Sequence, residues 1–429
     1  MDALFDFRQA GCRVRRLPRR PLFRTQRSVK WCSALSTDDD IVSATRSVVD
    51  TVHAGMGPQE PNLVLLFVSD GHAEHYGEVA ALVGGEFPAA LIIGCTARGV
   101  IGGGLEIESS GALSLTAAAL PGVTLNPFHL DAEELPEAER ASAFWSQRFG
   151  GLVGEDPCFL VLADPFSMDV ESMVRGLEAA FPGAPAIGGL ASGGGAPGEN
   201  ALYIGSDVHR SGAVGIALSG NILLETVVAQ GCRPVGLPMF VTRARENILF
   251  ELDGRPALQV ANEVIESLCE SDQMAAHQAL LLGLGMGDGQ GPFGQGDFLM
   301  RNLVGKDEPS GSLLVGAMLD EKQVVQFQLR DATAAREELQ ASLSQVGGGF
   351  AGAVLLSCLG RGEGLYGCAN HDSDQVRARC GEIPVAGFFA EGEVGPVGGE
   401  TFVHGYTSVI GLFRSRDSET ASVEVTEGS

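Results

Sequence analysis

The stretch Leu63–Ser69 reads LVLLFVS, an uninterrupted apolar run that is closed by a serine. A short, Val- and Leu-rich run of this kind predicts a strand in a sheet that is covered on at least one face. A helical stretch follows, and then a short strand that opens at Pro88 and ends at Gly94. A glycine-rich loop over 98–104 and a second apolar strand after Gly111 complete the pattern. This order of elements predicts a β-α-β-β unit.

The same order recurs twice further along the chain, which indicates an internal repeat. The second repeat has its first strand at 159–163, its short strand at 185–188, its glycine-rich loop at 188–195 and its closing strand after Gly212. The third repeat has the same elements at 353–358, at 384–387, at 391–399 and after Gly405. Apolar residues at helical spacing over 170–181 and 256–269 predict helices. We therefore expect an α/β fold in which repeated β-α-β-β units form mixed sheets with helices outside.

A longer segment, 221–350, separates the second unit from the third, and the chain of 429 residues suits two or three domains. This segment carries two further helical stretches and a hairpin-like run over 298–304, 312–318 and 324–329. The sequence Gly236-Leu237-Pro238 breaks the pattern and indicates a boundary near residue 237. We expect two related halves, 60–237 and 238–415, followed by a disordered tail over 416–429.

The first 37 residues differ in composition from the rest of the chain. They hold nine Lys or Arg and two acidic residues, with scattered Ser and Thr and no apolar core of a secretory signal. This composition predicts an organelle transit peptide that is cleaved off. The stretch 29–34, VKWCSA, resembles a plastid processing site, so we expect a chloroplast location, with the mitochondrion as the alternative. A basic arm that binds nucleic acid is the other interpretation.

The body of the chain, 38–429, is strongly acidic. Subtracting the leader from the chain's 29 basic and 54 acidic residues leaves 20 and 52, a net charge of −32. Such a charge repels phosphate backbones and anionic lipid, so we expect no nucleic-acid partner. A membrane helix needs about 20 apolar residues, and the apolar runs here are far shorter, so we expect no membrane span.

The sequence offers little sign of a metal or cofactor. Its nine cysteines form no C-x-x-C pair, which fits a reducing interior and argues against a structural metal. The pattern G-x-G-x-x-G occurs at 362–367, 193–198 and 289–294; the high glycine content predicts about one match by chance, and the repeated glycine-rich loops raise that number. After the first of these, the expected helix begins too late to direct its N-terminus at a pyrophosphate. No G-K-[ST] occurs, so we expect no cofactor.

Five segments resemble, in chain order, signatures of the FIST-domain family. They are 230–236 (QGCRPVG), 298–305 (FLMRNLVG), 357–362 (SCLGRG), 387–396 (GFFAEGEVGP) and 404–407 (HGYT). The resemblance runs from about residue 60 to residue 413 and covers a FIST N half and a FIST C half. Glu391 stands where the family usually has Asn, so an amide-mediated contact is not expected there.

The resemblance implies a sensory module in signal transduction. Proposed ligands of the family are small molecules, amino acids among them. Prokaryotic members are joined to signalling outputs, and eukaryotic members stand behind an F-box in ubiquitin signalling. Residues 38–60 are too few for an F-box, so we expect a stand-alone FIST pair that reports to an unidentified protein partner.

Candidate site residues come from the glycine-rich loops, whose backbone can approach a ligand closely. Arg361 follows a predicted buried strand and Arg233 occupies a comparable signature, so both could clamp a carboxylate. The alternative for each is a structural Arg that bonds loop carbonyls or an acidic neighbour. Cys358 is the best candidate nucleophile, with His371 or His404 as its base, although a Cys at a strand end is more often a small buried hydrophobe. The full set of predicted ligand-binding residues is Cys232, Arg233, Cys358, Gly360, Arg361, Gly362 and Glu393.

Two further patterns are open to a plainer explanation. His72 and His75 with Glu78 could hold a metal, but a solvated helical turn explains them better. Asp164 and Asp169 could bind an amine, although helix capping explains Asp169 equally well.

Three functions follow in order of preference. The first is a sensor that binds a small, polar, amino-acid-like metabolite in a cleft lined by glycine-rich loops, and it is not an enzyme. The second is an enzyme that uses Cys358 in acyl or thiol chemistry. The third is a protein-interaction scaffold related to the F-box members.

Overall fold

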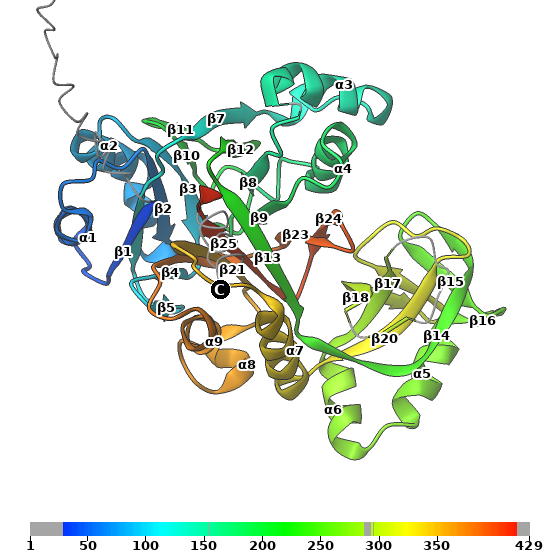
Figure 1. Ribbon diagram of the computed structural model, residues 1–429. Coiled ribbons are helices and arrows are strands. Elements are labelled where there is room, and N and C mark those ends of the chain that lie inside the picture. Colours follow the sequence, from blue (N-terminus) through cyan, green and yellow to red (C-terminus); the bar gives the residue numbers. More distant parts are fainter. Residues whose placement is uncertain (1–28, 153, 287–292, 295, 418–429) are drawn as a thin grey trace, which may run out of the picture.

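The computed structural model describes residues 29–152, 154–286, 293–294 and 296–417, and within them the chain forms three units of one design and one inserted lobe (Figure 1). The first unit comprises β1 (Lys30–Ser36), α1 (Ile41–Met56), β2 (Leu63–Ser69), α2 (Tyr76–Glu86), β3 (Leu91–Ala97), β4 (Val100–Gly102), β5 (Leu105–Ile107) and β6 (Leu113–Ala119). The second comprises β7 (Val123–Leu130), α3 (Ala138–Arg148), β8 (Cys158–Ala163), α4 (Val170–Ala180), β9 (Ala186–Leu190), β10 (Leu202–Ile204), β11 (Asp207–His209) and β12 (Ala213–Gly220).

The third unit is split by the inserted lobe. It comprises β13 (Leu223–Gln230), α7 (Ala332–Gln345), β21 (Gly352–Cys358), α8 (Gly362–Tyr366), α9 (His371–Cys380), β22 (Val385–Ala390), β23 (Glu393–Val397), β24 (Glu400–His404) and β25 (Thr407–Arg414). The lobe lies between β13 and α7 and comprises β14 (Cys232–Arg245), β15 (Ile248–Leu252), β16 (Arg255–Pro256), α5 (Ala257–Glu266), α6 (Glu270–Ala279), β17 (Leu280–Gly285), β18 (Phe298–Asp307), β19 (Ser312–Val315) and β20 (Val324–Arg330). The expected repeats, mixed sheets and outer helices are therefore confirmed, and each unit also has a strand and a helix before the expected β-α-β-β pattern.

Each unit lends its hairpin to the sheet of another unit. The three sheets have the strand orders β1-β6-β2-β3-β10-β11, β24-β23-β9-β8-β12-β7 and β13-β25-β21-β22-β4-β5. The hairpin of the first unit thus extends the third sheet, that of the second unit extends the first sheet, and that of the third unit extends the second sheet. This closed exchange ties the three units into one body.

The exchanged hairpin β4–β5 shows how such a hairpin docks. Glu106 accepts a hydrogen bond from the Ser373 N–H at the start of α9 at 2.6 Å, and its own N–H donates to the Asn370 side chain at 2.7 Å. The neighbouring Glu108 accepts the Glu363 N–H at 2.8 Å. Burial, with the nearby Asp372 charge, raises the pKa of Glu106 to about 7. Docking therefore orders the loop and helices that follow β21.

One glycine recurs at the same sheet position in all three units. In each unit this glycine is paired with a residue of the preceding parallel strand. The three pairs are Gly94 with Leu66, Gly188 with Val161 and Gly387 with Leu355. A Cβ at any of the three would overlap the carbonyl oxygen of that partner. Only glycine fits where two backbones approach so closely, which explains the short glycine-ended strands of the sequence pattern.

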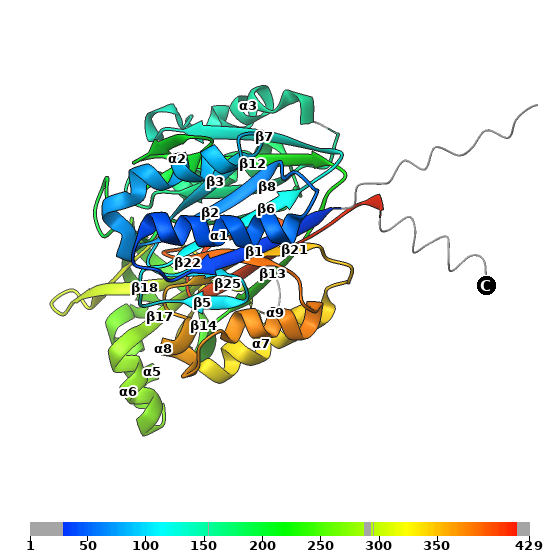
Figure 2. The same ribbon diagram turned by 90° about the vertical axis from the view of Figure 1, so that its left-hand side faces the viewer.

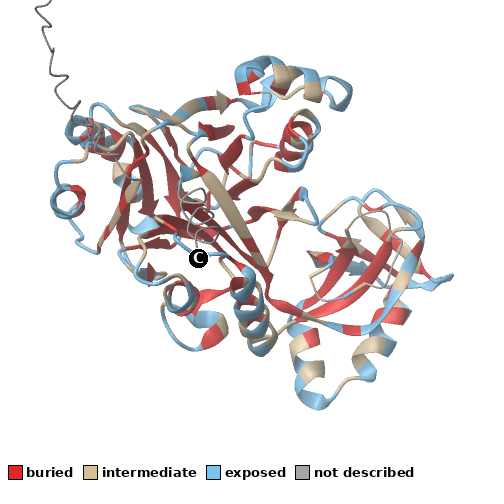
Figure 3. Cartoon of the chain, viewed as in Figure 1, coloured by how far each residue is buried: buried red, intermediate tan, exposed pale blue. Residues whose placement is uncertain are grey.

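The inner faces of the three sheets meet in one core, and the helices cover the outer faces (Figures 2 and 3). Phe67 of the first unit and Phe388 of the third contact each other there, with ring centroids 5.0 Å apart. Separate apolar clusters lie beneath the helices of each unit, and another fills the lobe. In Figure 1 the lobe stands beside the three-unit body.

The fold begins earlier than the sequence predicted. Residues 30–36, which we assigned to the cleaved leader, form β1 and pair with β6 along their whole length. Trp31 is buried and stacks on Phe413 with ring centroids 5.2 Å apart, so this strand belongs to the core. A leader that ended at residue 37 would remove a strand, so that boundary is corrected. The rest of the predicted leader, 1–28, and most of the predicted tail, 418–429, lie outside the described residues.

The boundary near residue 237 also shifts. Strand β14 runs through Gly236-Leu237-Pro238, and the break is a bulge in its pairing with β20 between Val235 and Met239. The lobe instead begins at Cys232 and ends at Arg330, which pair with each other. The predicted helices correspond to α4 and α5, and the predicted hairpin-like run corresponds to β18, β19 and β20.

Candidate functional site

Arg361 lies in the loop that leaves β21 and is only 1% exposed. Its Nε lies 3.0 Å from the carboxylate of Asp372 on α9. Nη1 donates to the Ala229 carbonyl at 3.3 Å, and Nη2 donates to the Tyr366 hydroxyl at 2.5 Å. A buried charge persists only when it is paired and hydrogen-bonded, so these contacts hold the loop to α9 and to β13.

Asp372 is equally well satisfied. Besides Arg361, it accepts hydrogen bonds from Ser357 at 3.2 Å, from Ser408, and from His371 at 2.9 Å. Burial raises the pKa of Asp372, but the Arg361 charge and these hydrogen bonds outweigh burial and hold the pKa below its ordinary value. Arg361 and Asp372 therefore satisfy each other inside the protein, which matches the alternative that Arg361 is a structural residue bonded to an acidic neighbour.

Arg233 at the start of the lobe has the same kind of partners. Its guanidinium lies 2.6 Å from Asp272 on α6 and 2.8 Å from Asp331, the residue that caps α7. It therefore links the lobe to the third unit through acidic neighbours, and it does not present a free charge to a ligand.

Cys358 and Glu393 form a buried pair at the end of β21. Glu393 is fully buried on β23, and its Oε2 accepts the Thr407 N–H at 3.2 Å. Its Oε1 has no hydrogen-bond partner among the described residues. Burial raises the pKa of Glu393 well above its ordinary value, and burial together with Glu393 raises the pKa of Cys358 to about 12. Burial therefore favours the protonated form of both side chains.

Arg330 and Tyr406 are half-buried residues near the end of β21, where Cys358 and Glu393 lie. Arg330 ends β20, and its guanidinium lies 5.9 Å from the ring centroid of Tyr406 and beside Gly360. Among the described residues, no hydrogen bond or ion pair reaches that guanidinium. Tyr406 has a left-handed backbone with φ 62°, and its hydroxyl donates to Asn302 of β18 at 2.5 Å. A strained tyrosine thus joins the β24–β25 turn to the lobe.

We name Cys358, Gly360, Glu393, Arg330 and Tyr406 the junction site. It lies where the lobe meets the third unit, because β14 leaves for the lobe and β20 returns from it at the Cys232–Arg330 pair. Burial favours the neutral forms of Cys358 and Glu393, and Arg361 is paired with Asp372. Arg330 is the cation among the five residues of the junction site, and a cation favours an anionic ligand.

Comparison with known families now decides the identity. The FIST N domain model matches residues 62–255, and the FIST C domain model matches residues 257–396. The chain belongs to the FIST-domain family. FIST domains are sensory domains of signal transduction.

The FIST relatives extend over most of the chain. An uncharacterized protein of Mycobacterium tuberculosis is 33% identical over 383 residues, which are 88% of this chain and 98% of the relative. An uncharacterized protein of Mycobacterium bovis is 33% identical over 359 residues, 83% of this chain and 91% of the relative. Among solved structures, one titled "Cyanuric acid hydrolase: evolutionary innovation by structural concatenation" covers 90% of this chain and 100% of its own, at a TM-score of 0.34 and 11% identity. So low a score supports no conclusion about chemistry.

The two FIST halves contain different numbers of units. The FIST N match contains most of the first unit, the whole second unit and the start of the lobe, and the FIST C match contains most of the lobe and of the third unit. The junction site therefore lies in the FIST C match, Arg330 included, except that Tyr406 lies just beyond it. None of the described helices is long and apolar enough to cross a membrane.

The geometry does not supply Cys358 with the histidine base that an enzyme would need. His404 bonds the Gly395 carbonyl at 2.9 Å, and burial lowers its pKa to about 4. His371 bonds Asp372 and stacks on Tyr366. The neighbour of Cys358 is Glu393, which raises the thiol pKa instead of lowering it.

We expect Cys358 to react slowly with iodoacetamide in the native protein. The thiolate is the reactive form, and a pKa near 12 reduces its fraction by about a thousandfold relative to an unperturbed thiol. Cys269 and Cys368 are exposed and serve as internal controls. Peptide mass spectrometry after timed alkylation at pH 7.5 should find these two modified first. Alkylation of Cys358 as fast as that of Cys269 would favour the enzyme hypothesis.

The other candidates from the sequence have local roles. His72 is buried, whereas His75 and Glu78 face solvent 3.6 Å apart, and no group of three metal-ligating side chains occurs in the part of the chain that the structure describes. Asp169 caps α4, and Asp164 is buried and accepts hydrogen bonds from Asn200 and Ser167.

The structure brings five of the seven predicted ligand-binding residues close to one another, and it adds two that we missed. The five are Cys358, Gly360, Arg361 and Gly362, which lie in one short segment, and Glu393, which lies against Cys358. Of the other two, Cys232 pairs with Arg330, and Arg233 pairs with Asp272 and Asp331. Gly362 starts α8 with φ 64°, a backbone that favours glycine. Tyr406 belongs to a quoted family segment, which was a signal for it. Arg330 had no signal except its place after a predicted strand.

Proposed function

We propose that the protein is a sensor that binds a small metabolite bearing a carboxylate, amino acids included, at the junction site. The observation that carries the proposal is the guanidinium of Arg330, which is half-buried, lies over the Tyr406 ring and has no acidic partner among the described residues. An arginine fork binds a carboxylate through two hydrogen bonds, and an aromatic ring holds it in place.

The buried groups of the junction site support the same ligand class. Burial favours the protonated forms of Glu393 and Cys358, which add no negative charge that would repel an anion. Gly360 leaves room beside the guanidinium, because it has no side chain. Arg361 acts as a positioning residue that holds this loop on Asp372.

The position of the junction site suits signalling. A ligand there would touch residues of the lobe and of the third unit at once, since Arg330 belongs to the lobe and Tyr406 and Gly360 to the unit. Other contacts also join the lobe to the body, among them Gln230 of β13 with the Phe298 carbonyl at 2.6 Å and Arg301 with Glu171 of the second unit at 2.8 Å. A ligand at the junction site would add to these contacts, and a partner protein could detect the resulting change at the lobe.

A thermal-shift screen of the full chain tests the proposal. The library pairs amino acids and organic acids with their neutral amides. A ligand at a hundred times its Kd should add about 2.7 kcal/mol to the free energy of unfolding and raise the midpoint. We expect shifts from acids but not from the matching amides, and the shift should vanish in Arg330→Ala.

Arg336→Ala is the matched control for that variant. Arg336 is also a half-buried arginine over a tyrosine, 5.8 Å from the Tyr366 ring, but on α7. Its loss should leave the ligand shift unchanged. Equal shifts from acids and amides, or a shift that survives Arg330→Ala, would refute binding of a carboxylate at Arg330.

A further inference from the structure

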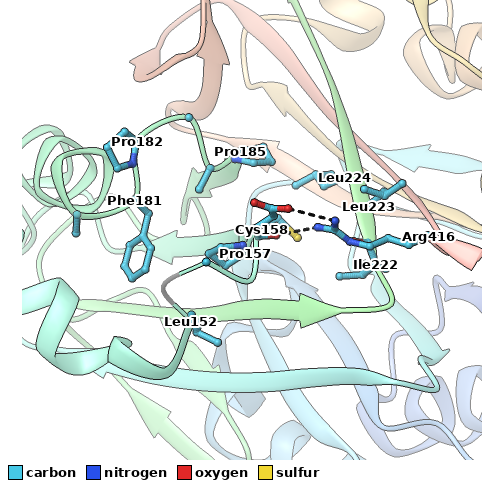
Figure 4. A pocket seen from close by; sticks show the side chains of 15 residues that line it. Leu152, Pro157, Cys158, Phe181, Pro182, Pro185, Ile222, Leu223, Leu224 and Arg416 are labelled. Atoms are coloured by element: carbon cyan, nitrogen blue, oxygen red, sulfur yellow. Dashed lines mark hydrogen bonds and ion pairs between the residues drawn. The ribbon is translucent and has the colours of Figure 1, made fainter.

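A cavity lies in the second unit, at the strand ends opposite to those that carry the junction site. It has a volume of about 460 Å³ and opens where β8 and β9 begin and where the chain passes from β12 to β13 (Figure 4). The junction site, by contrast, lies past the carboxyl end of β21. The two places share no residue, so the cavity is a separate candidate site. Its volume lies within the range of small-molecule sites.

The lining of this cavity is mostly apolar. The apolar side chains are those of Leu152, Pro157, Phe181, Pro182, Pro185, Ile222, Leu223 and Leu224. Three of these are prolines, which have no N–H to offer. The nearby backbone donors are already used, because the Gly183 N–H donates to Glu178 and the Ala184 N–H to the Phe181 carbonyl. Most of the lining can therefore hold only the apolar part of a ligand.

Arg416 provides the cation at the rim. Its Nε donates to the Ile222 carbonyl at 2.9 Å, and Nη2 donates to the Asp156 carbonyl at 3.0 Å. Nη1 makes the loosest contact, 3.4 Å from the carboxylate of Asp156, whose side chain is 83% exposed (Figure 4). An exposed ion pair of this length contributes little, so a ligand carboxylate could replace that of Asp156 at Nη1 while the two backbone contacts keep the guanidinium in place.

Apart from Arg416 and Asp156, the residues that line the cavity carry no charge. Arg416 and Asp156 are its charged lining residues, and burial raises the pKa of the Cys158 thiol to about 12, so that thiol is neutral. The corresponding place in the first unit, between α1, β2 and the end of β6, holds a cavity of about 190 Å³ whose charged lining residue is Glu60. The place in the second unit is therefore larger, and Arg416, which follows β25, gives it a cation.

We propose that the cavity of the second unit binds a small amphiphilic carboxylate, with its apolar body against Phe181 and Leu224 and its carboxylate on Arg416. This inference does not depend on the junction site. It predicts a preference for an acid over its amide that is set by Arg416, and a competition between the ligand and Asp156.

Isothermal titration of the full chain with octanoate and with octanamide tests this. Octanoate should bind at least about tenfold more tightly than octanamide, since a charge-assisted hydrogen bond is lost in the amide. Asp156→Asn removes the competing carboxylate and should strengthen octanoate binding several-fold without affecting octanamide. Arg416→Gln should abolish the preference for the acid, and Leu224→Trp should block both probes.

The controls keep the outcomes distinct. Arg330→Ala should leave octanoate binding unchanged, because Arg330 does not line this cavity. The Arg416→Gln variant also loses the contacts of Arg416 with Ile222 and Asp156. Should Arg416→Gln unfold, the gain in octanoate affinity of Asp156→Asn tests the proposal instead. Equal affinity for acid and amide, no gain in Asp156→Asn, or loss of octanoate binding in Arg330→Ala would each overturn the proposal.

Discussion

Replacing Gly94 by alanine should lower the free energy of unfolding by about 3 kcal/mol or more. The new Cβ would overlap the Leu66 carbonyl oxygen in the adjacent parallel strand, and backbone cannot move aside as a flexible side chain can. The neighbouring β2–β3 ladder would have to separate or shift. Urea denaturation followed by circular dichroism measures the loss. The same result is expected at the equivalent Gly188 and Gly387.

Gly85→Ala is the matched control for this substitution. Gly85 is an exposed residue of α2, and beyond its chain neighbours and the backbone of its own helix nothing lies within 4 Å of the position of its missing Cβ. Alanine there should stabilise the protein by about 0.5–1 kcal/mol, because alanine favours helix. A loss of stability in Gly94→Ala together with a gain in Gly85→Ala would confirm the close approach of β2 and β3. A mild effect of Gly94→Ala would show that the two strands tolerate a side chain at residue 94.

Replacing Asp372 by asparagine should cost about 3 kcal/mol, because it leaves the Arg361 charge buried without its counter-ion. Adding Arg361→Met in the Asp372→Asn background should cost much less than Arg361→Met alone, and this double-mutant cycle measures their coupling. Asp374→Asn is the control on the same helix. Its pair with Arg377 is exposed, so its loss should cost less than about 1 kcal/mol.

The pH dependence of stability gives an independent check of the same pair. The pKa of Asp372 is lowered in the folded protein, so its contribution is fully present above the pKa of the unfolded chain and is lost as pH falls below about 4. The difference in stability between the wild type and Asp372→Asn should therefore shrink in acid. A difference that is constant from pH 7 to pH 3 would show that Arg361 does not depend on the Asp372 charge.

The sequence predicted those parts of the fold that are encoded locally. The apolar runs at Leu63–Ser69 and its two repeats became β2, β8 and β21, because continuous burial needs a continuous apolar run. The exchange of hairpins left no such local sign. Val100 pairs with Phe388, almost 290 residues away, and a short hairpin pattern does not specify which sheet it will join.

The sequence predicted those residues of the site that lie in local, recognisable segments, and it missed those that reach the site through long-range packing. Cys358, Gly360 and Glu393 lie in recognisable segments at strand ends, where ligands of α/β sheets commonly bind. Arg361 was found, but its partner Asp372 was not considered, although an acidic residue early in the next helix could have indicated an internal pair. Arg330 could not be found, because it reaches the junction site only through the insertion of the lobe between β13 and α7.

The structure of a complex with the best acid from the thermal-shift screen tests the central claim most directly. We predict that the ligand carboxylate lies within about 3 Å of the Arg330 guanidinium, with Tyr406 and Gly360 in contact with the same molecule. A ligand bound elsewhere, with Arg330 still facing only Tyr406, would contradict the account of the junction site.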